Sequence, residues 1–249
     1  MRSISARAFA IVLPVALLLF GFSTWMAYQS SREREIASSM QVLGQDRALA
    51  QQALDLKFSE LEVAQRRARD RLLQFRQNGN LPDFDRHFPA KGDGTRRSGQ
   101  GLWDGTQSSL GPVKGFGAFI SDQQLSAERR RNLQAAFASL IGLVDGLPEN
   151  VNNLYFFSPN NDLIMHAPQR KDRLQFYRAE ATPDLDFQAE EFSEVVQPRV
   201  NPAGTMRCTS LRPILYDGSG QTWTTGCMTP VRDGSTQIGA FGSSILLEE

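Results

Sequence analysis

The sequence has few of the residues from which metal sites and nucleophilic active sites are built. Its 249 residues include two histidines, His87 and His166, and two cysteines, Cys208 and Cys227. The histidines lie far apart in the chain, and neither has the neighbours that a zinc site or a Ser-His-Asp triad requires. We therefore expect no catalytic residue, no metal and no cofactor in this chain, and no enzyme activity of its own.

The chain also lacks a net charge, internal repeats and low-complexity tracts. Its 27 Lys and Arg residues balance its 27 Asp and Glu residues. Without a basic excess there is no field to attract nucleic acid, so we expect no nucleic-acid partner. The glycine-rich stretch Gly92–Arg97 lacks the Gly-Lys-Ser/Thr ending of a phosphate loop, and we predict a surface loop there.

A long uncharged stretch is present near the N-terminus. Residues 8–28 contain no charged side chain. As a helix they would span about 30 Å, which is the thickness of a hydrocarbon core. Residues 1–7 are basic, and Trp25 and Tyr28 stand where interfacial aromatic residues are found. These features predict a cytoplasmic N-terminus at 1–7 and a transmembrane helix at 8–28 that contacts membrane lipid.

The same features predict a location for the protein. They indicate the bacterial inner (plasma) membrane, with a single N-terminal pass and the bulk of the chain periplasmic. The alternative is a cleaved signal peptide, but no Ala-x-Ala cleavage site follows the apolar stretch. In either case the rest of the chain is exported, which permits a disulfide.

Residues 29–78 have the pattern of one long stalk helix, with no proline and a single glycine, Gly44. Asn78-Gly79 predicts its end. The apolar residues of this helix form a stripe along one face. This stripe either packs only on the chain's own sheet or also pairs with a second copy, forming a homodimer through the stalk helix, and the sequence leaves both open. Apolar residues recur along one face at Ile36, Met40, Leu43, Ala50, Leu54, Phe58, Leu61, Ala68, Leu72 and Phe75.

Residues 79–147 are predicted to be a loop-rich extension that contains a second helix. The segment is rich in glycine and mostly aperiodic, and Phe116–Ile120 is either a short strand or a packed insert. Between Ser126 and Val144 the apolar residues return to helical spacing. Gly146 and Pro148 then predict the end of this helix.

Residues 148–249 have the pattern of an antiparallel sheet. Two short apolar runs at 153–158 and 163–167 flank a turn sequence and predict a hairpin. A polar crossover at 169–205 follows, with a helix around 187–196. Residues 206–249 then read as three strands joined by two Asp-Gly turns, which are strong hairpin signals. The fold class we expect is α+β: a transmembrane helix and stalk helix, then a five-stranded antiparallel sheet with flanking helices.

The first Asp-Gly turn sets a register that brings the cysteines together. If Asp217-Gly218 forms a two-residue turn, Cys208 lies directly opposite Cys227. Counting back from that turn places them at a hydrogen-bonded pair, where Cα atoms are about 5.5 Å apart and a disulfide is allowed. We therefore predict a Cys208–Cys227 disulfide, with two reduced, buried cysteines as the alternative.

The order of the elements resembles that of the PAS-like extracytoplasmic sensor modules called Cache domains. The likeness is carried by LYFFSPNNDLIMHAP in the first hairpin, then by PILYDGSGQTWTTGCMTPV and GSTQIGAFGSSILL. It covers residues 150–247, and the flanking helices fit it by topology. The resemblance implies the ligand-sensing input region of a membrane-bound receptor whose output domain, a histidine kinase or diguanylate cyclase, belongs to a longer parent protein.

A candidate ligand site follows from this register and this resemblance. The register places Arg212 opposite Trp223 and Ser210 opposite Thr225 on one sheet face. A Cache-like pocket lies between the sheet and the crossover, which adds Tyr177 and Arg178. An arginine beside an aromatic ring can bind an anionic or planar ligand. The alternative is that both aromatic residues belong to the core and that Arg212 forms an ordinary surface ion pair.

Two functions remain after these considerations. The first is a membrane-bound sensor that binds a small molecule, which the sequence does not identify, and shifts the sheet against the stalk helix. The second is a membrane-anchored structural or interaction protein of the envelope, pilin-like or scaffold-like, without a small-molecule ligand. Pilins also join an apolar N-terminal helix to a sheet with a disulfide, but this sequence lacks their leader-type junction.

Overall fold

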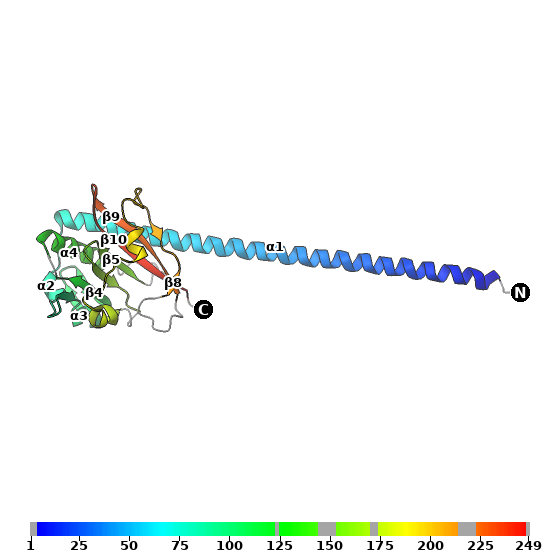
Figure 1. The fold of residues 1–249 in the computed structure, drawn as a ribbon, viewed down its shortest axis with the longest axis horizontal. Helices are drawn as coiled ribbons and strands as arrows, with labels where there is room; N and C mark the ends of the chain where they lie inside the picture. Colours follow the sequence, from blue (N-terminus) through cyan, green and yellow to red (C-terminus); the bar gives the residue numbers. More distant parts are fainter. Residues whose placement is uncertain (1–3, 123–124, 144–152, 170–173, 214–222, 248–249) are drawn as a thin grey trace. The chain divides into compact units, whose positions relative to one another are not determined.

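The computed structural model describes the chain except residues 1–3, 123–124, 144–152, 170–173, 214–222 and 248–249 (Figure 1). The side chains of residues 4–12 and 246–247 also lie outside the described part. The chain divides into two compact units, 1–56 and 57–249. We describe each unit by itself.

The first unit is helical and belongs to α1, which runs from Ile4 to Asn78. Its formation follows from a sequence with one proline, Pro14, and few glycines, so that little interrupts the backbone hydrogen bonds. The helix ends at Asn78 as predicted, where the Gly79 N–H donates to the Phe75 carbonyl at 2.9 Å. The exposed large apolar side chains of the first unit include Ile36, Met40, Val42, Leu43, Leu49, Leu54 and Leu56.

The transmembrane helix predicted at 8–28 is contradicted. No helix in the described part of the chain is long and apolar enough to cross a membrane. The stretch 8–28 lacks charge, but it also contains Pro14, Gly21, Ser23 and Thr24, so it is less apolar than its lack of charge suggests. A hydrocarbon core requires about 20 apolar residues. The predicted single pass through a bacterial inner membrane, with a periplasmic remainder, is therefore also wrong, and the predicted lipid contact loses its basis.

The second unit is built on one antiparallel sheet of eight strands, not the five that were predicted. The strand order is β1-β4-β6-β5-β10-β9-β7, and β8 also pairs with β9. Two of these strands come from the segment expected to be loop-rich, and β4 lies inside the sheet between β1 and β6. The bounds are β1 Thr95–Arg97, β4 Phe116–Ser121, β5 Leu154–Ser158, β6 Asp162–His166, β7 Arg207–Cys208, β8 Arg212–Pro213, β9 Trp223–Asp233 and β10 Thr236–Leu247.

Short elements connect and cover these strands. The predicted second helix is present as α4, capped by Ser126, whose hydroxyl accepts from the Arg129 N–H. The helix predicted around 187–196 is only the single turn α6, and a π-helix precedes it. The bounds are α2 Phe84–His87, α3 Gln100–Asp104, β2 Thr106–Ser108, β3 Gly111–Val113, α4 Ala127–Ile141, η2 Phe176–Glu180 and α6 Glu191–Glu194, with β2 and β3 forming a separate two-stranded sheet.

The sheet is buried on both faces, which explains the aromatic run in β5. Successive strand residues point to opposite faces. Phe156 packs in a core with residues of α1 and α4, such as Leu72 and Phe137. Tyr155 and Phe157 belong to a second core with the crossover segment, residues 174–205, through Tyr177, Phe187 and Phe192. The sheet therefore separates a helical layer from a crossover layer.

Two buried polar contacts fix the helical layer on the sheet. The Gln65 amide of α1, fully buried, donates to the Cys227 carbonyl at 2.7 Å and accepts from the Thr229 hydroxyl at 2.8 Å. On α4, Arg129 forms two hydrogen bonds with the Asp162 carboxylate, which has no exposed surface. A polar group without a partner is expensive in such surroundings, so each contact specifies the position of its helix.

The β9–β10 hairpin contains one turn and one bulge. The turn lies where Asp233-Gly234 predicted it, but its two central residues are Gly234 and Ser235, because Asp233 pairs with Thr236. Gly234 has φ 58°, a conformation that favours glycine. Three residues later the pairing with β9 shifts by one between Gln237 and Gly239. A bulge of this kind bends the strand and redirects side chains.

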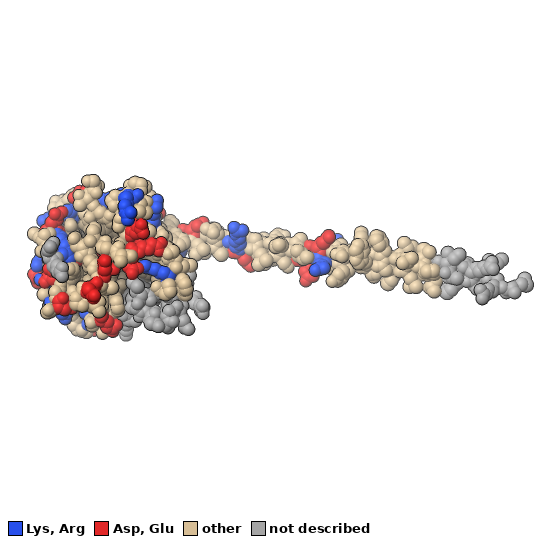
Figure 2. Space-filling model, in the orientation of Figure 1, with Lys and Arg blue, Asp and Glu red and all other residues tan. Residues whose placement is uncertain are grey.

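The surface charges of the second unit show no dominant sign on the face drawn in Figure 2, where basic and acidic residues are interspersed.

Candidate functional site

A cavity in the second unit lies between the sheet and the crossover segment. Its volume is about 530 Å³, which is within the usual range for small-molecule sites. Strands β5 and β10 form one wall, and the chain around α6 forms the other. Ten residues line it: Phe157, Pro159, Gln188, Ser193, Val196, Gln197, Pro198, Arg199, Gln237 and Gly239.

The β10 bulge shapes the sheet wall of this cavity. At Gly239 the backbone approaches β5 so closely that an added Cβ would lie 2.4 Å from both the Phe157 carbonyl oxygen and the Phe156 ring. Real Cβ atoms do not approach so closely, so only glycine fits here without a shift of the strands. The bulge beside it places Gln237 on the cavity wall.

Several of the lining polar groups are already used within the protein. The Gln188 amide nitrogen donates to the Ser158 carbonyl at 3.0 Å, and the Ser193 hydroxyl donates to the Phe187 carbonyl at 2.7 Å. These bonds hold the crossover segment against the sheet, so that the cavity has a preformed wall.

Arg199 is the only charged residue among the described residues that line the cavity. Its Nε donates to the Gln197 side-chain oxygen at 2.8 Å. Its guanidinium also lies 3.7 Å from the Glu194 carboxylate, but both side chains are more than half exposed. An exposed ion pair of this kind is weak, so the guanidinium remains accessible to a ligand.

A second, polar cavity of about 270 Å³ lies on the side of α1 and α4. Arg76 in the last turn of α1 forms ion pairs there with Glu128 and with Asp233 of the β9–β10 turn. Gln237 lines both cavities. The two cavities are therefore neighbours on either side of the β10 bulge.

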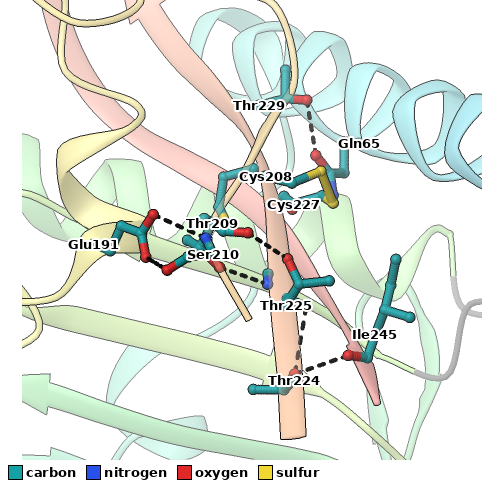
Figure 3. Close-up of a disulfide and its surroundings, with 12 residues drawn as sticks. Gln65, Glu191, Cys208, Thr209, Ser210, Thr224, Thr225, Cys227, Thr229 and Ile245 are labelled. Atoms are coloured by element: carbon teal, nitrogen blue, oxygen red, sulfur yellow. Dashed lines mark hydrogen bonds between the residues drawn. A yellow bond between two sulfur atoms is a disulfide. The ribbon is translucent and has the colours of Figure 1, made fainter. Parts of the chain in front are cut away.

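The predicted disulfide is formed in the structure, between Cys208 of β7 and Cys227 of β9 (Figure 3). Figure 3 also shows Gln65 of α1 beside it, bonded to Thr229. The Cα atoms lie 3.9 Å apart, and the neighbouring Thr209 N–H donates to the Gly226 carbonyl at 2.8 Å. The cysteines thus occupy a non-hydrogen-bonded pair, not the hydrogen-bonded pair that we expected.

The predicted pairing of Arg212 with Trp223 is wrong. Arg212 lies opposite Thr224, while the cysteines keep the predicted register, so one extra residue is accommodated between Cys208 and Arg212. The proposed turn at Asp217-Gly218, together with Tyr216 and Ser219, lies outside the described residues. Trp223 is 42% exposed. A one-residue shift is enough to separate side chains that a strict two-residue turn would place together.

The edge residues Ser210 and Arg212 instead contact the crossover glutamates. Arg212 pairs with Glu190, and its guanidinium lies 5.4 Å from the Phe192 ring centre. The hydroxyl and then the backbone N–H of Ser210 donate to Glu191 and hold the pKa of that carboxyl below its usual value. These contacts favour the alternative in which Arg212 forms an ordinary ion pair.

The other predicted ligand residues lie elsewhere. Thr225 donates its hydroxyl to the Thr209 carbonyl at 2.8 Å. Tyr177 is buried in the crossover-side core, and its carbonyl accepts from the buried Arg97 at 2.8 Å. Arg178 lies over Trp103, 5.2 Å from the ring centre. None of the six predicted residues is among the described residues that line the cavity at α6.

The residues that line the cavity were missed because the sequence gives little signal for them. Gln188, Gln197 and Arg199 lie in a polar stretch without helical or alternating periodicity. Gly239 was visible only as one of several glycines in the final strand. Within the described residues no group of three or more His, Cys, Asp or Glu side chains is positioned to hold a metal ion.

Known proteins add no information about this site. Searches found no matching family model, no matching curated protein and no matching solved structure. The function proposed below therefore depends on the cavity and the contacts around it.

Proposed function

We propose that the second unit is a PAS-like, Cache-like ligand-sensing module, the input region of a signal-transduction receptor. The observation that carries this proposal is the cavity of about 530 Å³ between the sheet and the crossover segment. It combines an apolar wall with a few polar groups and a glycine that admits close backbone approach, as small-molecule sites do.

The strand order supports the proposal. After the elements β1 to α4, the β5–β6 hairpin, the crossover segment and strands β7 to β10 follow one another, and β7 and β8 occupy the segment of the first of the three strands expected there. The last strand, β10, pairs with both β5 and β9 and so joins the first hairpin to the others in one sheet. The crossover segment covers this central region, which is where the cavity lies.

A contact between the cavity wall and α1 supports the coupling that a sensor needs. Gln237 lines the cavity, and Asp233 lies four residues before it at the hairpin turn. The Asp233 carboxylate accepts from the Arg76 guanidinium at 2.8 Å in the last turn of α1. A ligand that moves the β10 bulge would therefore change a contact of the helix.

A thermal-shift screen tests this function. The wild-type 249-residue chain should be stabilised by some members of a library of small organic acids, amides, amines and sugars, because a ligand that binds only the folded state raises Tm. Gln197→Trp, which fills the cavity, should abolish these shifts, whereas the exposed control Gln169→Trp should keep them. A library without any hit that Gln197→Trp abolishes would count against the sensor function.

The second candidate function is that of a structural or interaction protein without a ligand. The observation that favours it is the row of exposed apolar residues on the first unit, including Ile36, Met40, Leu43 and Leu54, at helical spacing. Such a row typically packs against another helix, here a second copy of the chain. Sedimentation should then show a dimer that Leu43→Glu with Leu54→Glu dissociates and Gln41→Glu does not. A monomeric wild-type protein would rule out this homodimer.

A further inference from the structure

We infer that the cavity at α6 selects a small monoanion, a carboxylate carried on an apolar, planar body with one hydrogen-bond donor. This inference rests on the sensor function proposed above and names the ligand class of the same site. It follows from three properties of the wall: its charge, its unused hydrogen-bonding groups and its apolar floor.

The charge of the wall has one sign. Arg199 carries the only charge among the described lining residues, and its neighbour Glu194 does not line the cavity. A ligand ammonium group would therefore meet a guanidinium and no carboxylate among the lining residues, while a ligand carboxylate would meet the guanidinium directly. The ion pair with Glu194, at 3.7 Å between exposed side chains, is weak enough for a ligand carboxylate to replace it.

The unused hydrogen-bonding groups indicate the same class. The Gln197 side-chain oxygen accepts from Arg199, which leaves the Gln197 amide nitrogen as a donor for a ligand. The terminal N–H groups of the Arg199 guanidinium are also donors that a ligand can reach. These are donors, and an ionised carboxylate is a pure acceptor. Gln188 uses its nitrogen for the Ser158 carbonyl and keeps its oxygen, so it can accept from a donor on the ligand body.

The floor of the cavity is apolar. Phe157 and Val196 are buried beneath it, and Pro159 and Pro198 border it. A rigid planar body buries much apolar area against such a floor at little cost in conformational entropy. Together the three properties describe an aromatic or similarly planar acid.

A matched probe series tests the inference on the 249-residue chain. Indole-3-acetate, indole-3-acetamide and tryptamine share the ring and its N–H but carry an anionic, a neutral and a cationic end. We expect the acid to bind about tenfold more tightly than the amide, which is the effect of one charge-assisted contact in a partly exposed place. Tryptamine should bind no more tightly than the amide. Calorimetry or ligand-observed NMR measures the three dissociation constants.

Two variants assign the preference to the arginine. Arg199→Gln should weaken binding of the acid about tenfold and leave the amide unchanged, because only the charged contact is lost. Glu194→Gln should strengthen binding of the acid a few-fold, since the guanidinium loses its competing partner. Arg67→Gln, an exposed arginine on α1, is the matched control and should change neither constant.

The outcomes separate the ligand class from the sensor function. The inference is overturned if the amide or amine binds as tightly as the acid, if Arg199→Gln leaves the preference intact, or if none of the three probes binds. The sensor function survives all of these outcomes as long as the wider screen finds a neutral or cationic ligand that Gln197→Trp abolishes.

Discussion

Individual residues join the edge of the sheet to its centre and to α1. Cys208 belongs to a strand of two residues, which alone would be held by few hydrogen bonds. Its bond to the buried Cys227 ties that edge to β9, whose carbonyl at the same residue accepts from Gln65 of α1. A single residue pair thus connects the outermost strand to the helical layer.

The disulfide should contribute substantially to stability. The two cysteines are 19 residues apart, and closing a loop of that length in the unfolded chain is worth about 3 kcal/mol. Cys208→Ser with Cys227→Ser should lower the free energy of unfolding by about that amount in urea titrations. Intact-mass thiol counting under denaturing conditions checks the bond itself. Two free thiols in the oxidised wild-type protein would contradict it.

The buried His87 predicts a loss of stability in mild acid. It is 4% exposed, its ring lies 5.2 Å from that of Phe137, and burial lowers its pKa, with Arg86 contributing in the same direction. The unfolded chain therefore takes up a proton near pH 6.5 that the folded chain resists. The free energy of unfolding should have its full value above this pH and should fall as the pH drops below it.

His87→Phe should flatten this dependence between pH 7 and pH 5, because the variant has no proton to take up at this position. Thermal melts at half-unit pH intervals measure it. An unchanged slope in the variant would show that other groups cause the acid sensitivity.

At the scale of elements, the helices and strands are positioned by a few contacts that tolerate little change. Arg129 connects α4 to the β5–β6 hairpin through the fully buried Asp162, and Gly239 lets β10 approach β5. Both contacts lie beside the β10 bulge and its two cavities. Weakening either contact is therefore expected to change the shape of the candidate site.

Arg129→Met should lower the free energy of unfolding by about 3 to 5 kcal/mol, because it leaves a buried carboxylate without its cation. The next residue in α4 offers a matched control. Arg130 pairs with the exposed Asp85, so Arg130→Met should cost less than about 1 kcal/mol. Equal losses in the two variants, measured by chemical denaturation, would argue against a special role for the buried pair.

Gly239→Ala should destabilise the second unit by about 1 to 3 kcal/mol, since the added methyl group meets backbone and ring atoms that cannot easily move. Gly92→Ala is the control, because nothing lies within 4 Å of a Cβ there, and its effect should stay within about 0.5 kcal/mol. Urea titration of both variants measures the change in the free energy of unfolding. A neutral Gly239→Ala would mean that β10 and β5 separate readily.

Whole-molecule organisation follows from the division into two units. Among the described residues, the strands and both hydrophobic cores belong to residues 57–249, and the first unit contributes no residue to them. A shortened chain of residues 57–249 should therefore keep the Tm of the 249-residue chain to within about 2 °C, because no described core residue is lost. Calorimetry compares the two chains. Failure of the shortened chain to unfold cooperatively would show that the first unit is needed for folding.

Local signals in the sequence predicted the local parts of this fold. The end of α1 at Asn78, the β5–β6 hairpin and the position of the β9–β10 turn all depend on neighbouring residues, and all were confirmed. The place of β4 depends on distant partners. Its run Phe116–Ser121 reads equally as a strand or an insert until β1 and β6 are known to flank it.

The candidate site was less predictable than the fold. The disulfide could be predicted because both cysteines lie in paired strands, but one extra residue after Cys208 moved Arg212 away from Trp223. The cavity depends on how an aperiodic crossover settles on the sheet, which no spacing of residues reveals. The transmembrane prediction for residues 8–28 depended on the absence of charge, and no helix in the described part of the chain is long and apolar enough to cross a membrane.

The buried Gln65 limits how α1 and the sheet can move past each other. One helical turn is 5.4 Å, and a slide of that size along β9 would bring Leu61 or Arg69 to the place of the amide. Both hydrogen bonds would break, leaving the Cys227 carbonyl and the Thr229 hydroxyl without their partner. Piston-like displacement of this end of the helix is thus disfavoured. Any motion that preserves both hydrogen bonds must keep residues 57–78 in register with β9.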